Sequence, residues 1–342
     1  MVGNCTPSFN VLVQSTTTDR GLYKSPAPVC LRIVVVGAGL SGLSAAIACA
    51  LSGHSVLVLE AVKELEELCL FRAPHYHVTN LTAMDPFLGR TGLQITPNAS
   101  RILKTWNLAD SLWQSAAEPT WQSIRRYSDG KVLSMDTDYD QKMHQRYGAP
   151  LLTIHKADLQ LALINRAKEL GVEFRLGDWL KDVNSDVPEV ITISGERFPC
   201  DLVVGADGLW SRCRECFLGT QDKPNATGDL AYRIMLRLKD IPDQDLRDLV
   251  AKPGLNFWLG PDCRVIAYSI RSGELYNIVL LRPDDLPAEV AKLEGSTEEM
   301  KALFANWDPT CVPPAAFIHI HPIRLILTFN SACSDSWALS LR

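Results

Sequence analysis

The chain has 342 residues, of which 46% are hydrophobic and 21% charged, and its formal net charge is −5. A chain of this length and apolar content can bury a core without disulfide bonds and has room for about two domains. The negative balance and the lack of any lysine or arginine stripe argue against a nucleic-acid partner, so the expected partners are small molecules.

The cysteines and the two ends of the chain indicate the cellular compartment in which we expect the protein. Ten cysteines are scattered singly, except for Cys213 and Cys216. No second Cys or His pair follows at ligand spacing, so reduced thiols are favoured over a zinc or redox site and no metal is predicted. Residues 1–30 lack the apolar core of a signal peptide, and the apolar stretch 315–329 is broken by His, Pro and Arg. We expect a disordered lead-in over 1–30 and a cytoplasmic protein without a membrane span.

A strand, a glycine-rich turn and an alanine-rich helix follow one another from residue 33. The turn contains Gly37, Gly39 and Gly42, and the helix is expected over 40–51. The first glycine permits a tight turn, the second lets the main chain approach a pyrophosphate, and the third allows close helix–strand packing. The N-terminus of the helix favours an anion through its N–H groups and its dipole. This pattern predicts a bound dinucleotide.

The next strand of the pattern ends on an acid. Residues 55–59 form an apolar run after Gly53, and Glu60 stands at its C-terminal end. A carboxylate in that place can accept a hydrogen bond from the adenosine ribose. The plainer interpretation of three glycines is a flexible turn before a helix, but the order strand, turn, helix, strand and acid favours nucleotide binding.

The middle of the chain alternates between helical and extended patterns. A helix is predicted from Pro97, with Ile102, Leu103 and Trp106 on one face, and another over 157–170, ending before Gly171. Short strands are predicted over 172–176, 190–194 and 202–204, and the last of them leads into Gly205-Ala206-Asp207-Gly208.

Beyond residue 230 the pattern changes to alternating runs rich in β-branched and aromatic residues. These runs cover 231–238, 256–259, 265–270 and 275–281, with turn residues between them. They predict a separate antiparallel sheet. Such a sheet could form one wall of a substrate site or a second core without any catalytic part, and the pattern alone leaves both open.

Three motifs in order give the chain a specific resemblance. They are 37–60, the run 201–208 that ends in Asp207-Gly208, and Gly-Asp-Leu-Ala-Tyr-Arg at 228–233. With them the chain resembles the FAD-dependent aromatic monooxygenases, and most of all the salicylate-hydroxylase-like enzymes of fungal secondary metabolism. The resemblance implies an α/β fold with a Rossmann-like FAD-binding domain over 31–110 and 151–228. It implies an antiparallel β-sheet substrate domain over 111–150 and 229–310, followed by an atypical tail over 311–342.

The same resemblance implies a set of cofactor contacts. FAD would lie along the first strand, turn and helix, with Glu60 at the ribose and Asp207 and Gly208 beside the pyrophosphate. Asp-Gly is also common in ordinary strand-end turns, which is the plainer interpretation of that pair. Gly92 would approach the flavin closely. Lys156 stands where relatives usually carry arginine, so it keeps the positive charge but loses the planar fork of a guanidinium group.

The resemblance also implies a reaction and two catalytic residues. NADPH or NADH would reduce the flavin transiently, and one oxygen atom of O2 would be transferred to an aromatic or polyketide-like phenol. Arg233 would stabilise the phenolate and Tyr268 would orient it. Without the resemblance, Arg233 is a sheet-edge charge and Tyr268 a core aromatic side chain.

Two departures from the family pattern leave alternatives open. Residues 68–90 intervene where relatives pass directly into the Gly92 segment, and the later Gly-Asp motif of the family is not found, since Gly177-Asp178 precedes its place in the order. The composition also changes after Pro309. We therefore expect a weakened FAD site in an enzyme truncated at its C-terminus. The alternatives are an NAD(P)-dependent dehydrogenase, which shares the opening motif, and a non-catalytic truncated product.

Overall fold

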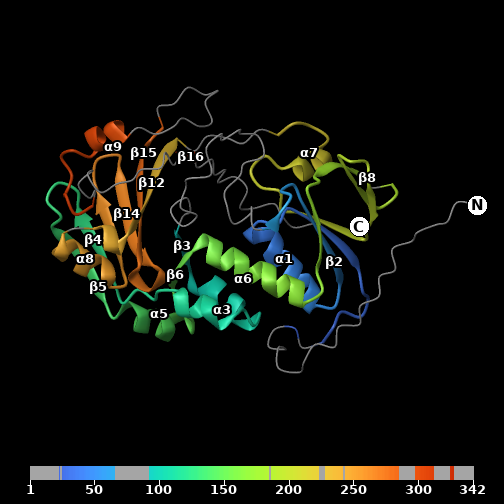
Figure 1. Cartoon of the computed structure of the whole chain (residues 1–342), viewed down its shortest axis with the longest axis horizontal. Coiled ribbons are helices and arrows are strands. Elements are labelled where there is room, and N and C mark those ends of the chain that lie inside the picture. Colours follow the sequence, from blue (N-terminus) through green and yellow to red (C-terminus); the bar gives the residue numbers. More distant parts are fainter. Residues whose placement is uncertain are drawn as a thin grey trace, which may run out of the picture. The chain divides into compact units, whose positions relative to one another are not determined.

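The computed structural model describes residues 23, 25–65, 92–184, 186–222, 228–241, 243–284, 297–311 and 324–326. The chain divides into two compact units, coloured along the sequence in Figure 1. One unit comprises Met1–Leu68, Thr105–Leu108 and Gln160–Gly219, and the other comprises Cys69–Lys104, Ala109–Leu159 and Thr220–Arg342. Within the described part of the chain, every helix is too short or too polar to cross a membrane.

The first unit is built on a parallel four-stranded sheet with the order β11-β1-β2-β7. Its strands are β1 (Arg32–Val36), β2 (Ser55–Glu60), β7 (Glu173–Leu176) and β11 (Leu202–Gly205). The apolar run of β1 is buried because the strand lies between β2 and β11. Helix α1 (Leu40–Leu51) joins β1 to β2 and buries Leu43, Ala46 and Ile47. The predicted strand–helix–strand unit is confirmed, including both ends of the helix.

The remaining elements of the first unit include a separate three-stranded sheet. They are the antiparallel strands β8 (Leu180–Asn184), β9 (Glu189–Thr192) and β10 (Arg197–Pro199), helix α7 (Arg212–Leu218), and most of helix α6 (Lys156–Glu169). Leu159, Leu163 and Ala167 of α6 are buried, as their helical spacing predicts.

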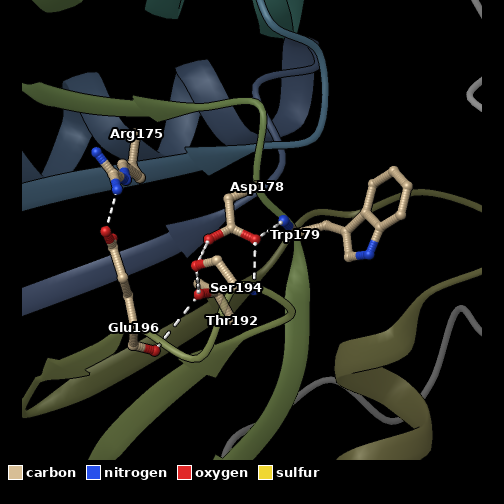
Figure 2. Close-up of polar contacts among 6 residues, drawn as sticks. All are labelled: Arg175, Asp178, Trp179, Thr192, Ser194 and Glu196. Carbon is tan, nitrogen blue, oxygen red and sulfur yellow. Dashed lines mark hydrogen bonds and ion pairs between the residues drawn. The ribbon is translucent and has the colours of Figure 1, made fainter.

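The turn after β7 is held by a buried carboxylate. Asp178 accepts hydrogen bonds from the backbone N–H of Trp179, at 3.0 Å, and from the backbone N–H and hydroxyl of Ser194 (Figure 2). Ser194 follows β9, so these bonds tie the entry of β8 to the turn between β9 and β10. Gly177-Asp178 is thus part of the frame of this small sheet.

The second unit is built on a seven-stranded sheet with the order β16-β12-β15-β14-β13-β4-β5. The four predicted runs are β12 (Asp229–Arg237), β13 (Gly254–Leu259), β14 (Arg264–Ile270) and β15 (Leu275–Pro283), and they pair antiparallel as expected. Strand β4 (Trp121–Arg126) adds to β13 in parallel, followed by β5 (Val132–Thr137), and β16 (Arg324–Ile326) adds to β12. The pattern had not predicted these three additions.

Shorter elements surround this sheet. A two-stranded antiparallel pair joins β3 (Gly92–Ile95) to β6 (Leu152–His155). The helices are α3 (Pro97–Thr105), α4 (Asp110–Ser115), α5 (Tyr139–Tyr147), α8 (Gln244–Ala251) and α9 (Thr297–Leu303), with 3-10 turns η1 (Leu238–Asp240) and η2 (Arg271–Gly273). In α3 the prediction for Ile102 is wrong: its side chain is 42% exposed, whereas Leu103 is buried. Neighbouring helical residues point about 100° apart, so at the edge of the buried stripe Leu103 faces inward while Ile102 is exposed.

The two faces of the large sheet carry different cores. One face packs Ile234, Trp258, Val265, Ala267 and Ile278 into an apolar cluster. The opposite face carries Met235, Leu255, Tyr268 and Ile270, packed with Leu151. Because side chains alternate along a strand, Arg233 and Asn277 lie on this second face as well. That face is therefore apolar apart from a few polar side chains.

Candidate functional site

The three glycines of the loop after β1 differ in what surrounds them. Gly37 has φ +102°, and a Cβ atom there would lie 2.4 Å from the carbonyl oxygen of Ala206. At Gly42 a Cβ would lie 1.9 Å from the carbonyl oxygen of Gly37, so only glycine lets α1 pack on the loop. At Gly39 nothing described lies within 4 Å of the added atom. The middle glycine thus leaves open space beside the main chain.

Helix α1 begins at this open position without a side-chain cap. Gly39 is its N-cap residue, and the first turn carries no acidic residue. The first N–H groups of a helix have no partner within the helix and carry its partial positive charge. They are therefore available to an anion at the edge of the loop.

Glu60 is tied to the glycine-rich loop. Its Oε2 accepts a hydrogen bond from the backbone N–H of Ala38 at 2.7 Å, and its Oε1 accepts one from Val62 at 3.1 Å. Among the described residues no cation pairs with it. A carboxylate has about four acceptor sites, so two bonds leave capacity for a ribose hydroxyl.

Gln160 holds the other side of the same peptide segment. Its side chain is 4% exposed, and Nε2 donates to the carbonyl oxygen of Ala38 at 3.2 Å. Both backbone groups of Ala38 are therefore anchored, the N–H by Glu60 and the carbonyl by Gln160. Sequence reasoning missed Gln160, because a single glutamine in a helix carries no signal of what it contacts.

The Asp207-Gly208 turn lies against the same loop. A Cβ atom at Gly37 would lie 3.1 Å from Cα of Asp207, so the two motifs meet although 170 residues separate them. Asp207 uses both carboxylate oxygens on α7: one accepts from the hydroxyl of Ser211 at 2.5 Å and the other from the N–H of Cys213 at 2.9 Å. Gly208 has φ +84° and open space beside it. Asp207 thus shapes this turn by capping α7.

These features fit a dinucleotide. An uncapped helix N-terminus and the open side at Gly39 suit a diphosphate, and Glu60 retains acceptor capacity for a ribose. The predicted residues Gly37, Gly39, Gly42, Glu60, Asp207 and Gly208 are therefore gathered at one end of the parallel sheet in the first unit.

In the second unit, Arg233 and Tyr268 are neighbours on one face of the large sheet. Arg233 on β12 lies opposite Val279 of β15, while Tyr268 on β14 lies opposite Asn277, two residues along β15. Burial lowers the pKa of Arg233, although the nearby Tyr268 opposes the shift. Burial raises the pKa of Tyr268, and the charge of Arg233 acts in the opposite direction. A partly buried cation thus stands beside a protonated phenol.

Gly92 lies directly against this pair of strands. A Cβ atom at Gly92 would lie 2.8 Å from Cε2 of Tyr268 and 3.1 Å from the Cβ of Asn277. The N–H of Gly92 donates to Oδ1 of Asn277 at 3.0 Å. Glycine is therefore required here by contact with the sheet, a reason that the sequence did not show.

Lys156 directly follows the residue that pairs with Gly92. Gly92 pairs with His155 across β3 and β6, and Lys156 follows His155 as the first residue of α6. Asp158, in the first turn of α6, forms a two-pronged ion pair with Arg271 at 2.6 and 2.9 Å. Lys156, Gly92, Tyr268 and Arg233 thus belong to the second unit.

The Cys213–Cys216 pair has none of the features of a reactive thiol site. Both cysteines lie within α7, and Cys213 is buried in the core of the first unit. Burial raises the pKa of both thiols. In the part of the chain that the structure describes, no group of three or more His, Cys, Asp or Glu residues could hold a metal ion.

Comparison with known proteins gives a consistent result. The family described as "FAD binding domain" matches residues 31–262. The FAD-dependent monooxygenase OpS4 of Beauveria bassiana is 43% identical over 284 residues, which cover 82% of this chain and 61% of OpS4. The 3-hydroxybenzoate 6-hydroxylase of Polaromonas naphthalenivorans is 28% identical over 288 residues, 83% of this chain and 65% of that protein. The chain thus spans about three-fifths of the length of these relatives.

Solved structures agree on the fold. HpxO of Klebsiella pneumoniae, crystallised with FAD and uric acid, superposes with a TM-score of 0.67 at 21% identity, over 87% of this chain and 68% of HpxO. At this identity the likeness concerns the fold alone. Together with the family match over 31–262 and the glycine-rich loop, uncapped helix and acid of the first unit, it leads to one conclusion: the chain belongs to the FAD binding domain family.

Proposed function

We propose that this chain carries the FAD site and the substrate site of a monooxygenase that hydroxylates an aromatic or polyketide-like phenol, with NADPH or NADH as transient reductant. The observation that supports it most is the partly buried cation of Arg233 beside Tyr268, on the apolar face of a sheet in a chain of the FAD binding domain family. The similarity to OpS4, an FAD-dependent monooxygenase, and to 3-hydroxybenzoate 6-hydroxylase supports the same reaction class.

The proposed roles in cofactor binding follow from the loop. Gly39 and the N–H groups of α1 would receive the diphosphate, Glu60 the ribose, and Gly37 and Gly42 would keep the loop in shape. Asp207 and Gly208 would line the neighbouring turn. Gly92 and Lys156 would serve the flavin side, with the ammonium of Lys156 as a single point charge. Residues 31–110 and 151–228 would form the FAD-binding domain, and 111–150 and 229–310 the substrate domain.

The proposed roles in chemistry belong to Arg233 and Tyr268. Bound FAD, once reduced, supplies the activation of O2 and the transfer of one oxygen atom to the ring. Arg233 would bind the phenol oxygen as an anion, because a guanidinium group that loses water on burial gains from an anionic partner. A phenolate is more electron-rich than a phenol, so the ring would react more readily with an electrophilic oxygen. Tyr268 would hold the ring in place.

The test uses the full chain loaded with FAD. We expect flavin absorbance at one FAD per chain, NADPH oxidation that depends on a phenol such as 3-hydroxybenzoate or 2,4-dihydroxybenzaldehyde, and incorporation of one atom from labelled O2 into the product. Arg233→Gln should abolish phenol-dependent oxidation and keep the bound flavin. Arg264→Gln is the matched control, since Arg264 is an exposed arginine of the same sheet, paired with Asp229.

Three outcomes would count against the proposal. Protein without affinity for FAD would contradict the cofactor. Hydride transfer between nicotinamide and substrate without oxygen incorporation would indicate a dehydrogenase. Equal loss of activity in Arg233→Gln and Arg264→Gln would show that Arg233 has no specific role in binding the substrate.

A further inference from the structure

Asn277 is fully buried, yet half of its amide has no partner in the described part of the chain. The side chain is 1% exposed on β15, and Oδ1 accepts the hydrogen bond from the N–H of Gly92. A backbone N–H can only donate, so this bond fixes which end of the amide is the oxygen and turns Nδ2 the other way. Among the described residues, no acceptor lies within hydrogen-bond distance of that buried Nδ2.

A second buried asparagine in the same sheet has hydrogen-bond partners for both its oxygen and its nitrogen. Asn256 on β13 is 2% exposed and lies on the opposite face. Its Oδ1 accepts from the hydroxyl of Ser123 at 2.9 Å and from Nε of Arg125 at 3.3 Å, and its Nδ2 donates to the hydroxyl of Tyr276 at 3.4 Å. Nδ2 of Asn256 therefore has a partner, whereas Nδ2 of Asn277 has none among the described residues. Buried polar groups are rarely left so without a reason.

The unused donor lies beside the proposed substrate site. Asn277 is directly opposite Tyr268 on one side and Met235 on the other, and Arg233 lies one step diagonally along the same face. Directly opposed and diagonal neighbours on one face are within reach of each other's side chains. Nε of Arg233 is likewise buried without a hydrogen-bond acceptor among the described residues. Two donors without partners among the described residues thus lie on the same side of Tyr268, on β15 and β12.

We propose that Nδ2 of Asn277 donates a hydrogen bond to a second oxygen atom of the substrate. The site would then select phenols that also carry a carbonyl or carboxylate oxygen, with Arg233 on the phenolate and Asn277 on the second acceptor. This inference rests on the proposed function, because the role of Arg233 marks where the substrate binds. The bond from Gly92 polarises the amide and makes its free N–H a better donor, so the Gly92 segment supports the contact.

The experiment compares two neutral probes that differ by one carbonyl group, resorcinol and 2,4-dihydroxybenzaldehyde. Their dissociation constants are measured by calorimetry on the full FAD-loaded chain, and their ratio cancels effects common to both probes. Asn277→Asp keeps the acceptor for Gly92 and removes the donor, and Asn277→Ala removes the donor without adding charge. The matched controls are Asn256→Asp and Asn256→Ala, on the opposite face.

We expect both Asn277 variants to reduce the preference for the aldehyde about tenfold, the usual effect of one lost hydrogen bond to an oxygen acceptor. The Asn256 variants should leave the preference unchanged. A preference that is equal in wild type and in both Asn277 variants would overturn the inference, as would a wild type that does not prefer the aldehyde.

A spectroscopic measurement on the wild type covers the case in which the Asn277 variants do not fold. The carbonyl stretch of bound 2,4-dihydroxybenzaldehyde should shift to lower wavenumber than in an aprotic solvent, because the carbonyl accepts a new hydrogen bond. An unshifted band would overturn the inference. If the protein hydroxylates phenols but does not prefer the aldehyde, the proposed function stands and the role of Asn277 is wrong. If it prefers the aldehyde but shows no flavin chemistry, the role of Asn277 stands and the proposed function is wrong.

Discussion

The carboxylate of Glu60 accepts a hydrogen bond from the backbone N–H of Ala38, with 2.7 Å between Glu60 Oε2 and Ala38 N. The acid at the end of β2 is therefore fastened to the glycine-rich loop after β1, and Gln160 fastens the same loop from its carbonyl side. Preorganisation of this kind reduces the ordering that a bound ligand would otherwise require. It also separates the residues that shape the loop from those that would touch FAD.

Replacing Glu60 by glutamine should weaken FAD binding by about ten- to a hundredfold, because one hydrogen bond to a charged acceptor contributes about 1.5–3 kcal/mol. Glutamine retains one acceptor oxygen, so the loop should stay folded. Flavin fluorescence titration measures the affinity. Glu64→Gln, at an exposed carboxylate a few residues along, is the control. If the two variants bind FAD equally well, Glu60 has no part in the site.

Alanine at Gly39 and at Gly42 should have opposite consequences. Gly39 has φ −67° and open space, so Gly39→Ala should change the free energy of unfolding by less than about 0.5 kcal/mol while lowering FAD affinity. In Gly42→Ala the new Cβ would clash with the Gly37 carbonyl, so that variant should lose about 1–3 kcal/mol of stability. Urea unfolding and flavin titration of both variants check this. A Gly39→Ala protein with normal affinity would contradict diphosphate binding at the loop.

The cation of Arg233 should lower the pKa of a bound phenol. A nearby positive charge favours the anion, and a partly buried one is weakly screened by water. In Arg233→Met the pKa of bound 2,4-dihydroxybenzaldehyde should rise relative to wild type, as followed by the ultraviolet band of the phenolate across a pH titration. Arg264→Gln should leave that titration unchanged. The same pKa in wild type and Arg233→Met would show that the guanidinium does not contact the phenol oxygen.

Asp178 should make the free energy of unfolding of the first unit depend on pH in the acid range. Burial by itself raises the pKa of this carboxyl, but hydrogen bonds from Ser194, Thr192 and Trp179 outweigh it, and the pKa is lowered. A folded pKa below the unfolded one stabilises the fold above the unfolded pKa, about 3.9. That contribution is lost as the pH falls through the folded pKa. Figure 2 draws the bonds of Asp178 to Ser194 and Trp179, and the contact of Thr192 with Ser194.

Asp178→Asn should therefore cost about 1–3 kcal/mol near pH 7, with a smaller difference from wild type near about pH 3. Urea unfolding followed through tryptophan fluorescence measures both values. Asp186→Asn, at an exposed aspartate of the same small sheet, should have little effect at either pH. A difference that does not shrink in acid would mean that the ionised form is not what the turn stabilises.

Local pattern was sufficient for the nucleotide unit. Helix α1 and the flanking strands lie where the glycine spacing and apolar runs predicted them, because Gly37 and Gly42 are required by a contact or a dihedral angle within the motif itself or at the adjoining turn. Long alternating runs likewise predicted β12, β14 and β15. The prediction for Ile102 was wrong because this residue lies at the exposed edge of the apolar stripe of α3, about 100° around the helix from the buried Leu103.

Sequence by itself determined the family, the dinucleotide loop and the antiparallel strands that carry Arg233 and Tyr268. Only the tertiary structure decided what the polar side chains do: that Asp207 caps α7, that Gln160 anchors Ala38, that Gly92 needs to be glycine because of Tyr268, and that Asn277 keeps an unused donor. The physical reason is that periodicity reports which face of an element is buried. Which atoms meet depends on contacts between segments far apart in the chain, such as Gln160 with Ala38 and Gly92 with Asn277, and a single sequence contains no record of those contacts.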